Sequence, residues 1–159
     1  MFRLVYDKKS AAAAPSVKEA LNTVFWLKTD EELHLDPAEV KGAYNLLRRQ
    51  YNASKLLNYL HGNTNADSLS LWIVSDDLYV AGMNFVFGLA YPGKAAVLST
   101  YRLDSLDLVN KEAIHEMGHV FGLQHCTNDC VMQFSNSLYE AKAKPAKLCE
   151  RCRSLLTLY

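Results

Sequence analysis

Three histidines and a glutamate lie close together in the segment His115-Glu-Met-Gly-His119-Val-Phe-Gly122-Leu-Gln-His125. If the segment begins as a helix, His115 and His119 are one turn apart and present their imidazoles on one face. Gly122 can adopt a positive φ and end the helix, so the chain can turn and bring His125 to the same point. Glu116 then projects near enough to reach a water molecule held by the histidines. Three imidazoles with a free fourth position form the open, catalytic kind of zinc site.

This motif is more specific than a pair of histidines alone. A bare HExxH pattern can arise by chance in an amphipathic helix, whereas the added glycine and third histidine at fixed offsets make coincidence improbable. The alternative is a set of ordinary core or surface histidines on a helix. The other two histidines, His34 and His61, are isolated in the sequence, and we expect them to be solvated or locally hydrogen-bonded.

All four cysteines lie in the C-terminal part of the chain, as the pairs Cys126 and Cys130, and Cys149 and Cys152. Two pairs separated by about twenty residues are the ligand arrangement of a closed, four-cysteine structural zinc. Two disulfides or four buried free thiols are the alternatives that spacing leaves open. Because Cys126 directly follows His125, a zinc on the cysteines would tie the loop after His125 to the final helix.

The composition indicates one folded domain and excludes some classes of partner. A chain of 159 residues with 50% hydrophobic residues can bury a sizeable core. Its 17 acidic and 17 basic residues cancel, so it lacks the basic face that a nucleic-acid binder needs. No apolar run approaches the roughly 20 residues that span a bilayer, and charged Asp7, Lys8 and Lys9 leave no signal-peptide core after Tyr6. We therefore expect a cytoplasmic monomer that binds neither nucleic acid nor membrane, and a reducing compartment favours metal-bound cysteines over disulfides.

Helical and β-rich segments alternate along most of the chain, which favours an α/β layered fold. Strands are expected over 2–6, 33–35, 69–74, 84–91 and 95–102, and helices over 16–27, over 52–60, from Asp107 to about Leu123, and from Pro145 through Cys149 and Cys152. The sequence Tyr91-Pro-Gly-Lys94 has type II turn chemistry, so the last two strands should form a hairpin-like return.

The sequence resembles the archaemetzincins, a family within the metzincin clan of zinc metallopeptidases. The resemblance rests on the HExxHxxGxxH signature followed at once by Cys126, on Cys130-Val-Met132 and on Cys149-Glu-Arg-Cys152. It extends more weakly to Arg48-Arg-Gln-Tyr51 and to Asn84-Phe-Val-Phe-Gly88. The first two cysteines are separated by three residues rather than the four of the family pattern, and the gap from Met132 to Cys149 is one residue short. Both departures change the loops and keep the ligand pairs.

The resemblance implies a metzincin-like fold: a five-stranded mixed, twisted sheet, an active-site helix beneath it, and a small C-terminal part clamped by zinc. It also implies that Met132 forms a tight turn, the Met-turn, under the zinc-binding imidazoles. From the residue type alone, Met132 is a pliable gap-filler in a core. We expect a single catalytic domain over 1–159, with an N-terminal subdomain of about 1–122 and a C-terminal subdomain of about 123–159.

The predicted function is zinc-dependent hydrolysis of peptide bonds in a peptide or protein substrate. Two Zn²⁺ ions per chain are expected, a catalytic one on His115, His119 and His125 and a structural one on Cys126, Cys130, Cys149 and Cys152. Glu116 would be the general base. The alternative is a zinc-containing peptide-binding protein with a closed or latent active site, but retention of Glu116 favours the enzyme. A zinc deaminase is excluded, because its pattern is H-x-E with a later P-C-x-x-C, which this sequence lacks.

Segment 84–89 is either an ordinary core strand or the sheet's edge strand, to which a substrate peptide could add by main-chain hydrogen bonds. Asp76 and Asp77 follow the strand expected over 69–74 and are interpreted as a solvated loop pair rather than a cation site. Segment 48–51 is interpreted as a solvated helix face.

Overall fold

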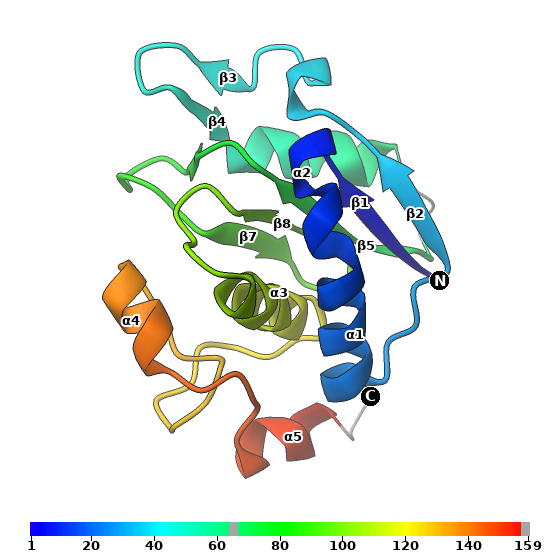
Figure 1. Cartoon of the computed structure of the whole chain (residues 1–159), viewed down its shortest axis with the longest axis vertical. Helices are drawn as coiled ribbons and strands as arrows, with labels where there is room; N and C mark the ends of the chain where they lie inside the picture. Colours follow the sequence, from blue (N-terminus) through cyan, green and yellow to red (C-terminus); the bar gives the residue numbers. More distant parts are fainter. Residues whose placement is uncertain (64–66, 157–159) are drawn as a thin grey trace.

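A five-stranded mixed sheet forms the centre of the molecule (Figure 1). The structure, a computed structural model, describes residues 1–63 and 67–156. The strand order is β2 (Glu31–His34), β1 (Phe2–Tyr6), β5 (Leu69–Val74), β8 (Ala95–Ser99) and β7 (Gly88–Tyr91). Neighbouring strands pair in parallel from β2 to β8, whereas β7 is antiparallel to β8. The expected mixed five-stranded sheet is therefore confirmed, and β7 is one of its edges.

The two faces of the sheet carry separate hydrophobic cores, because successive side chains of a strand point to opposite faces. On one face, Leu71 and Ile73 of β5 pack with α1 (Ala14–Phe25) and α3 (Leu106–Val120). On the other face, Trp72 and Val74 pack with α2 (Ala53–Gly62). In Figure 1, α2 lies above the sheet and α3 below it. Helix α3 is thus enclosed between the sheet and the C-terminal segment of the chain.

The expected helices are present with adjusted ends. The side chain of Asn52 caps α2 by accepting a hydrogen bond from the Lys55 amide. Helix α3 is capped by Ser105, which accepts a hydrogen bond from the Leu108 amide at 3.2 Å, so Asp107, where the helix was expected to begin, lies in its first turn. Short 3-10 helices, η1 (Lys8–Ala13) and η2 (Pro37–Glu39), precede α1 and follow β2.

The C-terminal helices differ from the prediction. A short helix, α4 (Leu138–Ala143), was not predicted, and α5 (Glu150–Leu156) begins well after Pro145. Cys149 therefore precedes the helix and only Cys152 lies on it. Lys144 has extended backbone, as expected for a residue before proline, and its carbonyl accepts a hydrogen bond from the Lys111 ammonium. These tertiary contacts hold the chain extended where a helix start was expected.

A second, three-stranded sheet contains the segment predicted to be a solvated helix face. It consists of β3 (Tyr44–Asn45), β4 (Gln50–Asn52) and β6 (Leu78–Tyr79). Gln50 and Tyr51 are buried in it, so the helix prediction for 48–51 is wrong.

The predicted hairpin is confirmed. The Lys94 amide donates to the Tyr91 carbonyl and Gly93 has a φ of +75°. The edge strand begins only at Gly88. In the segment 84–87 before it, Val86 forms an isolated bridge with Leu78, and the Phe87 carbonyl accepts a hydrogen bond from the Ser99 amide at 2.8 Å. The edge-strand interpretation of 84–89 therefore holds for its last residues alone. Among residues 1–63 and 67–156, no helix has the length and apolar character needed to cross a membrane.

Candidate active site

The three histidines of the sequence motif meet at the C-terminal half of α3. His115 and His119 project from the helix, and His125 returns from the loop after Gly122, whose φ is +97°. One ring nitrogen from each histidine lies within 4.8 Å of the others. The Nε2 atoms of His115 and His119 are 3.2 Å apart. The structure therefore brings the predicted histidine set together at one point.

Backbone carbonyls fix the direction in which two of these imidazoles offer their lone pairs. His115 Nδ1 lies 2.8 Å from the carbonyl oxygen of Val131, and His119 Nδ1 lies 2.7 Å from that of Leu123. A carbonyl only accepts, so each Nδ1 carries the proton and each Nε2 keeps a free lone pair. Two lone pairs facing each other at this separation repel, and a shared cation removes the repulsion. Neutral imidazoles held in this way fit Zn²⁺.

Burial lowers the pKa of all three histidines, that of His115 well below its ordinary value. The positive charge of Lys144 lowers the pKa values of His115 and His125 further. Imidazoles with lowered pKa are neutral at neutral pH, which is the form that binds a metal.

Glu116 is buried beside the histidines, with 5% of its surface exposed, and it lines the same cavity. Burial raises the pKa of Glu116 to about 8, and the negative charge of Glu112 adds to the effect while Lys144 opposes it. The backbone of Gly88, at the start of edge strand β7, lies directly against the carboxyl. A Cβ at Gly88 would come within 2.9 Å of Glu116 Cδ and 2.6 Å of the Val97 carbonyl oxygen. Only glycine lets the edge strand pass this close to the carboxyl.

A cavity of about 300 Å³ opens between the histidines and the edge of the sheet. One wall comes from segment 80–92 and the other from segment 134–136. The cavity is lined by Val80, Met83, Phe85, Val86, Phe87, Gly88, Leu89, Ala90, Pro92, Glu112, His115, Glu116, His119, His125, Phe134, Ser135 and Asn136. Its walls are mostly apolar, and its polar groups converge on the histidine cluster.

A buried ion pair beneath the histidines was not predicted. The Lys144 side chain is 0% exposed, and its Nζ lies 3.1 Å from Glu112 Oε1 and 3.1 Å from the carbonyl oxygen of Gln133. The same Nζ is 3.3 Å from His115 Nδ1, but that nitrogen already donates its proton to a carbonyl. The ion pair thus links α3 to the chain that follows Met132. Glu112 precedes Glu116 by one helical turn, a signal that sequence reasoning could have used, whereas nothing in the sequence marks Lys144.

Met132 lies under the histidine helix, as the family resemblance implies. It is fully buried, and a Cβ added at Gly118 would overlap its sulfur atom. A turn closes between the Gln133 amide and the Cys130 carbonyl, 3.1 Å apart, and the Cys126 amide donates to the Met132 carbonyl. The segment that carries Met132 is therefore bonded to the residue that follows His125.

The four cysteine sulfurs converge without forming a disulfide. All four Sγ atoms lie within 4.8 Å of one another, and Cys126 Sγ and Cys149 Sγ are 3.8 Å apart. A tetrahedral zinc with Zn–S bonds of about 2.3 Å would separate its sulfurs by about 3.8 Å. Backbone amides of Met132 and Cys149 donate to Cys130 Sγ. The amide of Cys152 lowers the pKa of Cys149 to about 6, whereas burial raises the pKa of Cys152. This arrangement fits a tetrathiolate metal site better than two disulfides.

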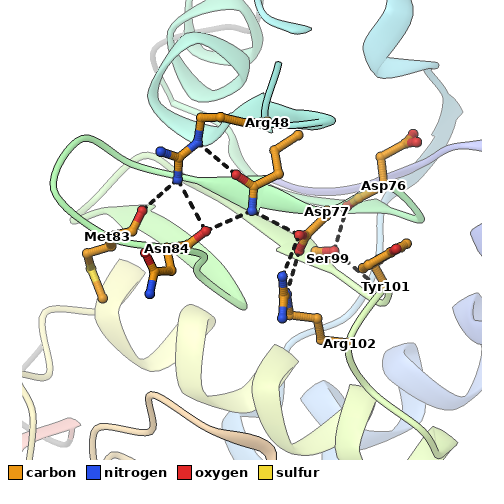
Figure 2. Close-up of polar contacts among 9 residues, drawn as sticks. Arg48, Asp76, Asp77, Met83, Asn84, Ser99, Tyr101 and Arg102 are labelled. Atoms are coloured by element: carbon orange, nitrogen blue, oxygen red, sulfur yellow. Dashed lines mark hydrogen bonds and ion pairs between the residues drawn. The ribbon is translucent and has the colours of Figure 1, made fainter. Parts of the chain in front are cut away.

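Asp76 and Asp77, the acidic pair after β5, lie in different environments. The prediction of a solvated loop pair therefore holds for Asp76 and is wrong for Asp77. Asp76 is exposed, but Asp77 is buried and accepts two hydrogen bonds of 2.9 Å from the Arg102 guanidinium (Figure 2). Asp77 is therefore a structural ion-pair partner, and it does not line the cavity at the histidines.

A glutamate held beside three converging imidazoles, below the edge strand of a mixed sheet, defines a zinc metallopeptidase of the metzincin type. Residues 33–157 match the sequence model of peptidase family M54. An archaemetzincin of Nanoarchaeum equitans is 52% identical over 110 residues, which cover 69% of this chain and 64% of that relative. An archaemetzincin of Archaeoglobus fulgidus is 47% identical over 118 residues, covering 70% of this chain and 71% of the relative.

Solved structures agree with these sequence matches. The crystal structure of archaemetzincin from Methanopyrus kandleri has a TM-score of 0.86 at 35% identity and covers 99% of this chain and 94% of that one. The crystal structure of a zinc-dependent peptidase from Methanocorpusculum labreanum has a TM-score of 0.85 at 26% identity, with 98% and 100% covered. The chain therefore belongs to peptidase family M54, the archaemetzincins, and is a zinc metallopeptidase.

Proposed function

We propose that this chain hydrolyses peptide bonds with a zinc ion held by His115, His119 and His125 and with Glu116 as general base. The observation that carries the proposal is the pair of free Nε2 lone pairs that face each other beside a buried carboxyl with a raised pKa. When bound there, zinc would supply Lewis-acid activation of the scissile carbonyl and of a water molecule. Glu116 accepts the proton of that water and returns it to the leaving amine.

A second zinc on Cys126, Cys130, Cys149 and Cys152 is part of the proposal. Its support is the convergence of four free thiols whose sulfur atoms lie within 4.8 Å of one another, with Cys126 Sγ and Cys149 Sγ 3.8 Å apart. A closed site of this kind has no open position, so its role is mechanical. We propose that it fixes segment 123–159 as a C-terminal subdomain on the 1–122 subdomain within one catalytic domain. We also propose that the protein is monomeric and cytoplasmic. A reducing compartment such as the cytoplasm keeps the cysteine thiols available for metal.

The competing function is a zinc-containing peptide-binding protein with a closed cleft. The cavity over the histidines and the exposed ring of His125 favour the enzyme, because both leave the proposed metal position accessible.

An unbiased peptide-library cleavage assay tests the proposal. It compares the wild-type chain with Glu116→Ala and with Glu19→Ala, a control at an exposed glutamate of α1. We expect cleavage by the wild type and the control and none by Glu116→Ala. Equal silence from all three proteins, with zinc bound, would favour the peptide-binding function.

A further inference from the structure

A buried polar network next to the cavity has no part in the proposed hydrolysis (Figure 2). At its centre, Gln50 of β4 is 5% exposed and Asp77 is 6% exposed. The Gln50 amide nitrogen donates to Asp77 Oδ2 at 2.9 Å and to the Asn84 carbonyl at 2.8 Å. Arg102 neutralises Asp77 from the other side, and Arg48 Nε donates to Gln50 Oε1 at 2.8 Å. Each polar side chain of this network is thus oriented by its neighbour in the network.

The network ends on the backbone of segment 80–87, which we call the rim segment. Arg48 Nη2 donates to the Met83 carbonyl at 2.7 Å and to the Asn84 carbonyl at 3.2 Å (Figure 2). The Arg102 guanidinium lies 4.0 Å from the centre of the Phe85 ring. The rim segment is therefore held by side chains from β4, from the turn before it and from the loop after β8.

The inner side of the rim segment faces the proposed active site. Val80, Met83, Phe85, Val86 and Phe87 line the same cavity as the histidines and Glu116. The segment continues directly into Gly88, whose backbone lies against the Glu116 carboxyl. The rim segment is not a regular strand. Backbone hydrogen bonds hold it at Val86 and Phe87, and the side chains of Arg48 and Gln50 hold it at the carbonyls of Met83 and Asn84.

We propose that Arg48 and Gln50 are positioning residues that hold the rim segment over the cleft and thereby set how tightly the apolar side chains of a peptide bind. The inference rests on the proposed function, since it takes a peptide as the ligand. The planar guanidinium of Arg48 reaches Gln50 and two carbonyls at once, which a lysine ammonium on a flexible stem does not reproduce. Gln50 needs both an oxygen and an amide group, because it accepts from Arg48 and donates to Asp77 and Asn84.

Two zinc-binding ligands of different size distinguish the contribution of the rim segment to binding from the contribution of the metal site. Acetohydroxamate is a minimal ligand, and a dipeptide hydroxamate with leucine and phenylalanine side chains also reaches the cavity walls. Their affinities are measured by calorimetry on the zinc-loaded full chain for wild type, Arg48→Lys and the matched control Arg49→Lys, at an exposed neighbour. We expect Arg48→Lys to weaken the dipeptide ligand about tenfold, as loss of one charged hydrogen bond would. Acetohydroxamate affinity and both affinities of the control should stay within about twofold of wild type.

Hydrogen exchange of the amides in 80–88 gives a second measurement that needs no ligand. We expect faster exchange in Arg48→Lys and in Gln50→Glu, which places a carboxylate against Asp77 and the Asn84 carbonyl. Unchanged affinity for the dipeptide, or equal weakening of both hydroxamates, would overturn the positioning role. If zinc-loaded wild type binds neither hydroxamate, the proposed function fails. The exchange rates then still test the positioning role of Arg48 and Gln50, because unchanged exchange in both variants would overturn it.

Discussion

Glu112 and Glu116 occupy successive turns of α3, and burial raises the pKa of both carboxyls. Their surroundings assign them different tasks. Both carboxyls line the cavity, but Glu112 is paired with the buried ammonium of Lys144 at 3.1 Å, whereas Glu116 lies against Gly88 of the edge strand. Two carboxyls separated by one helical turn thus have different partners, and the proposed function gives the proton-transfer role to Glu116.

The stability of the chain without zinc on its histidines should report the raised pKa of Glu116. Between pH 4.5 and about 8 the folded chain keeps a proton that the unfolded chain has released. The free energy of unfolding therefore falls as pH rises through this window. Glu116→Gln cannot lose a proton, so its unfolding free energy should fall less with pH. Urea unfolding at about pH 5.5 and about pH 7.5, after mild chelation, measures both slopes. Equal slopes would mean that Glu116 titrates as an exposed carboxyl does.

Removing one partner of the Lys144–Glu112 pair should lower the free energy of unfolding more than removing the charges of both partners. Lys144→Met leaves a buried carboxylate without its partner, which costs about 3–5 kcal/mol of unfolding free energy. Adding Glu112→Gln removes the uncompensated charge, so the double variant should regain part of the loss. Urea unfolding of the wild type, both single variants and the double variant completes the cycle. Additive losses would show that the two side chains do not interact.

Residue types and spacing were sufficient to predict which histidines and cysteines converge, but not the groups that orient them. The histidines, Glu116 and the cysteine pairs stand out in sequence because few residue types bind zinc. The carbonyls of Val131 and Leu123 that orient the imidazoles belong to backbone that every residue has. Lys144 is one of many lysines, and its contact with Glu112 depends on how the C-terminal segment packs.

At the scale of elements, α3 was predictable because its apolar residues recur at helical spacing over several turns. Segment 48–51 was not predictable, because a three-residue strand is too short to show any period. Its partner, β6, lies far along the chain and pairs Tyr51 with Leu78. The helix expected at Pro145 failed for a related reason, since the Lys111 contact with the Lys144 carbonyl acts between distant parts of the chain.

The C-terminal helix α5 should depend on the cysteine cluster for its position. Cys149→Ser replaces a thiolate ligand with a poor one, and Cys149 lies directly before α5. The helix should loosen, and through Cys126 the adjacent His125 should loosen with it. We expect a lower melting temperature and weaker binding of zinc by the histidines. Thermal unfolding and zinc titration measure the two effects, and Ser154→Ala, on an exposed position of α5, is the control. Wild-type melting with two zinc ions retained would contradict the clamp role.

At the scale of the whole molecule, α3 is held from two sides. The sheet packs on one side through Leu71 and Ile73, and the C-terminal segment, in yellow to red in Figure 1, lies on the other. That segment packs against the helix through buried apolar side chains such as Val131, Met132 and Leu148. It is also attached by polar contacts of Lys111 and Lys144 and by the cysteine cluster. The histidine cluster lies between the two parts, so the position of its third histidine, His125, depends on the attachment of the C-terminal segment.

Two zinc ions of unequal lability should follow from this architecture. The cysteine cluster is largely buried and offers four thiols with no open position, whereas His125 is exposed at the mouth of a cavity. Tetrathiolate zinc coupled to folding has apparent binding free energies on the order of 10–16 kcal/mol. A three-imidazole site with an open position exchanges its metal more readily. Mild chelation should therefore remove one zinc equivalent, abolish any hydrolysis and leave the melting temperature close to that of the untreated protein.

Stronger chelation should remove the second equivalent and unfold the C-terminal segment, because the binding free energy of that zinc is part of the folding free energy. Metal analysis after each step, with thermal unfolding on the same samples, checks the order of release. Re-addition of one zinc equivalent after mild chelation should restore hydrolysis without changing the melting temperature by more than a few degrees. A single zinc bound by histidines, with disulfides detected by mass spectrometry, would rule out the tetrathiolate site, and loss of fold with the first equivalent would show that the histidine zinc, not the cysteine zinc, holds the two parts together.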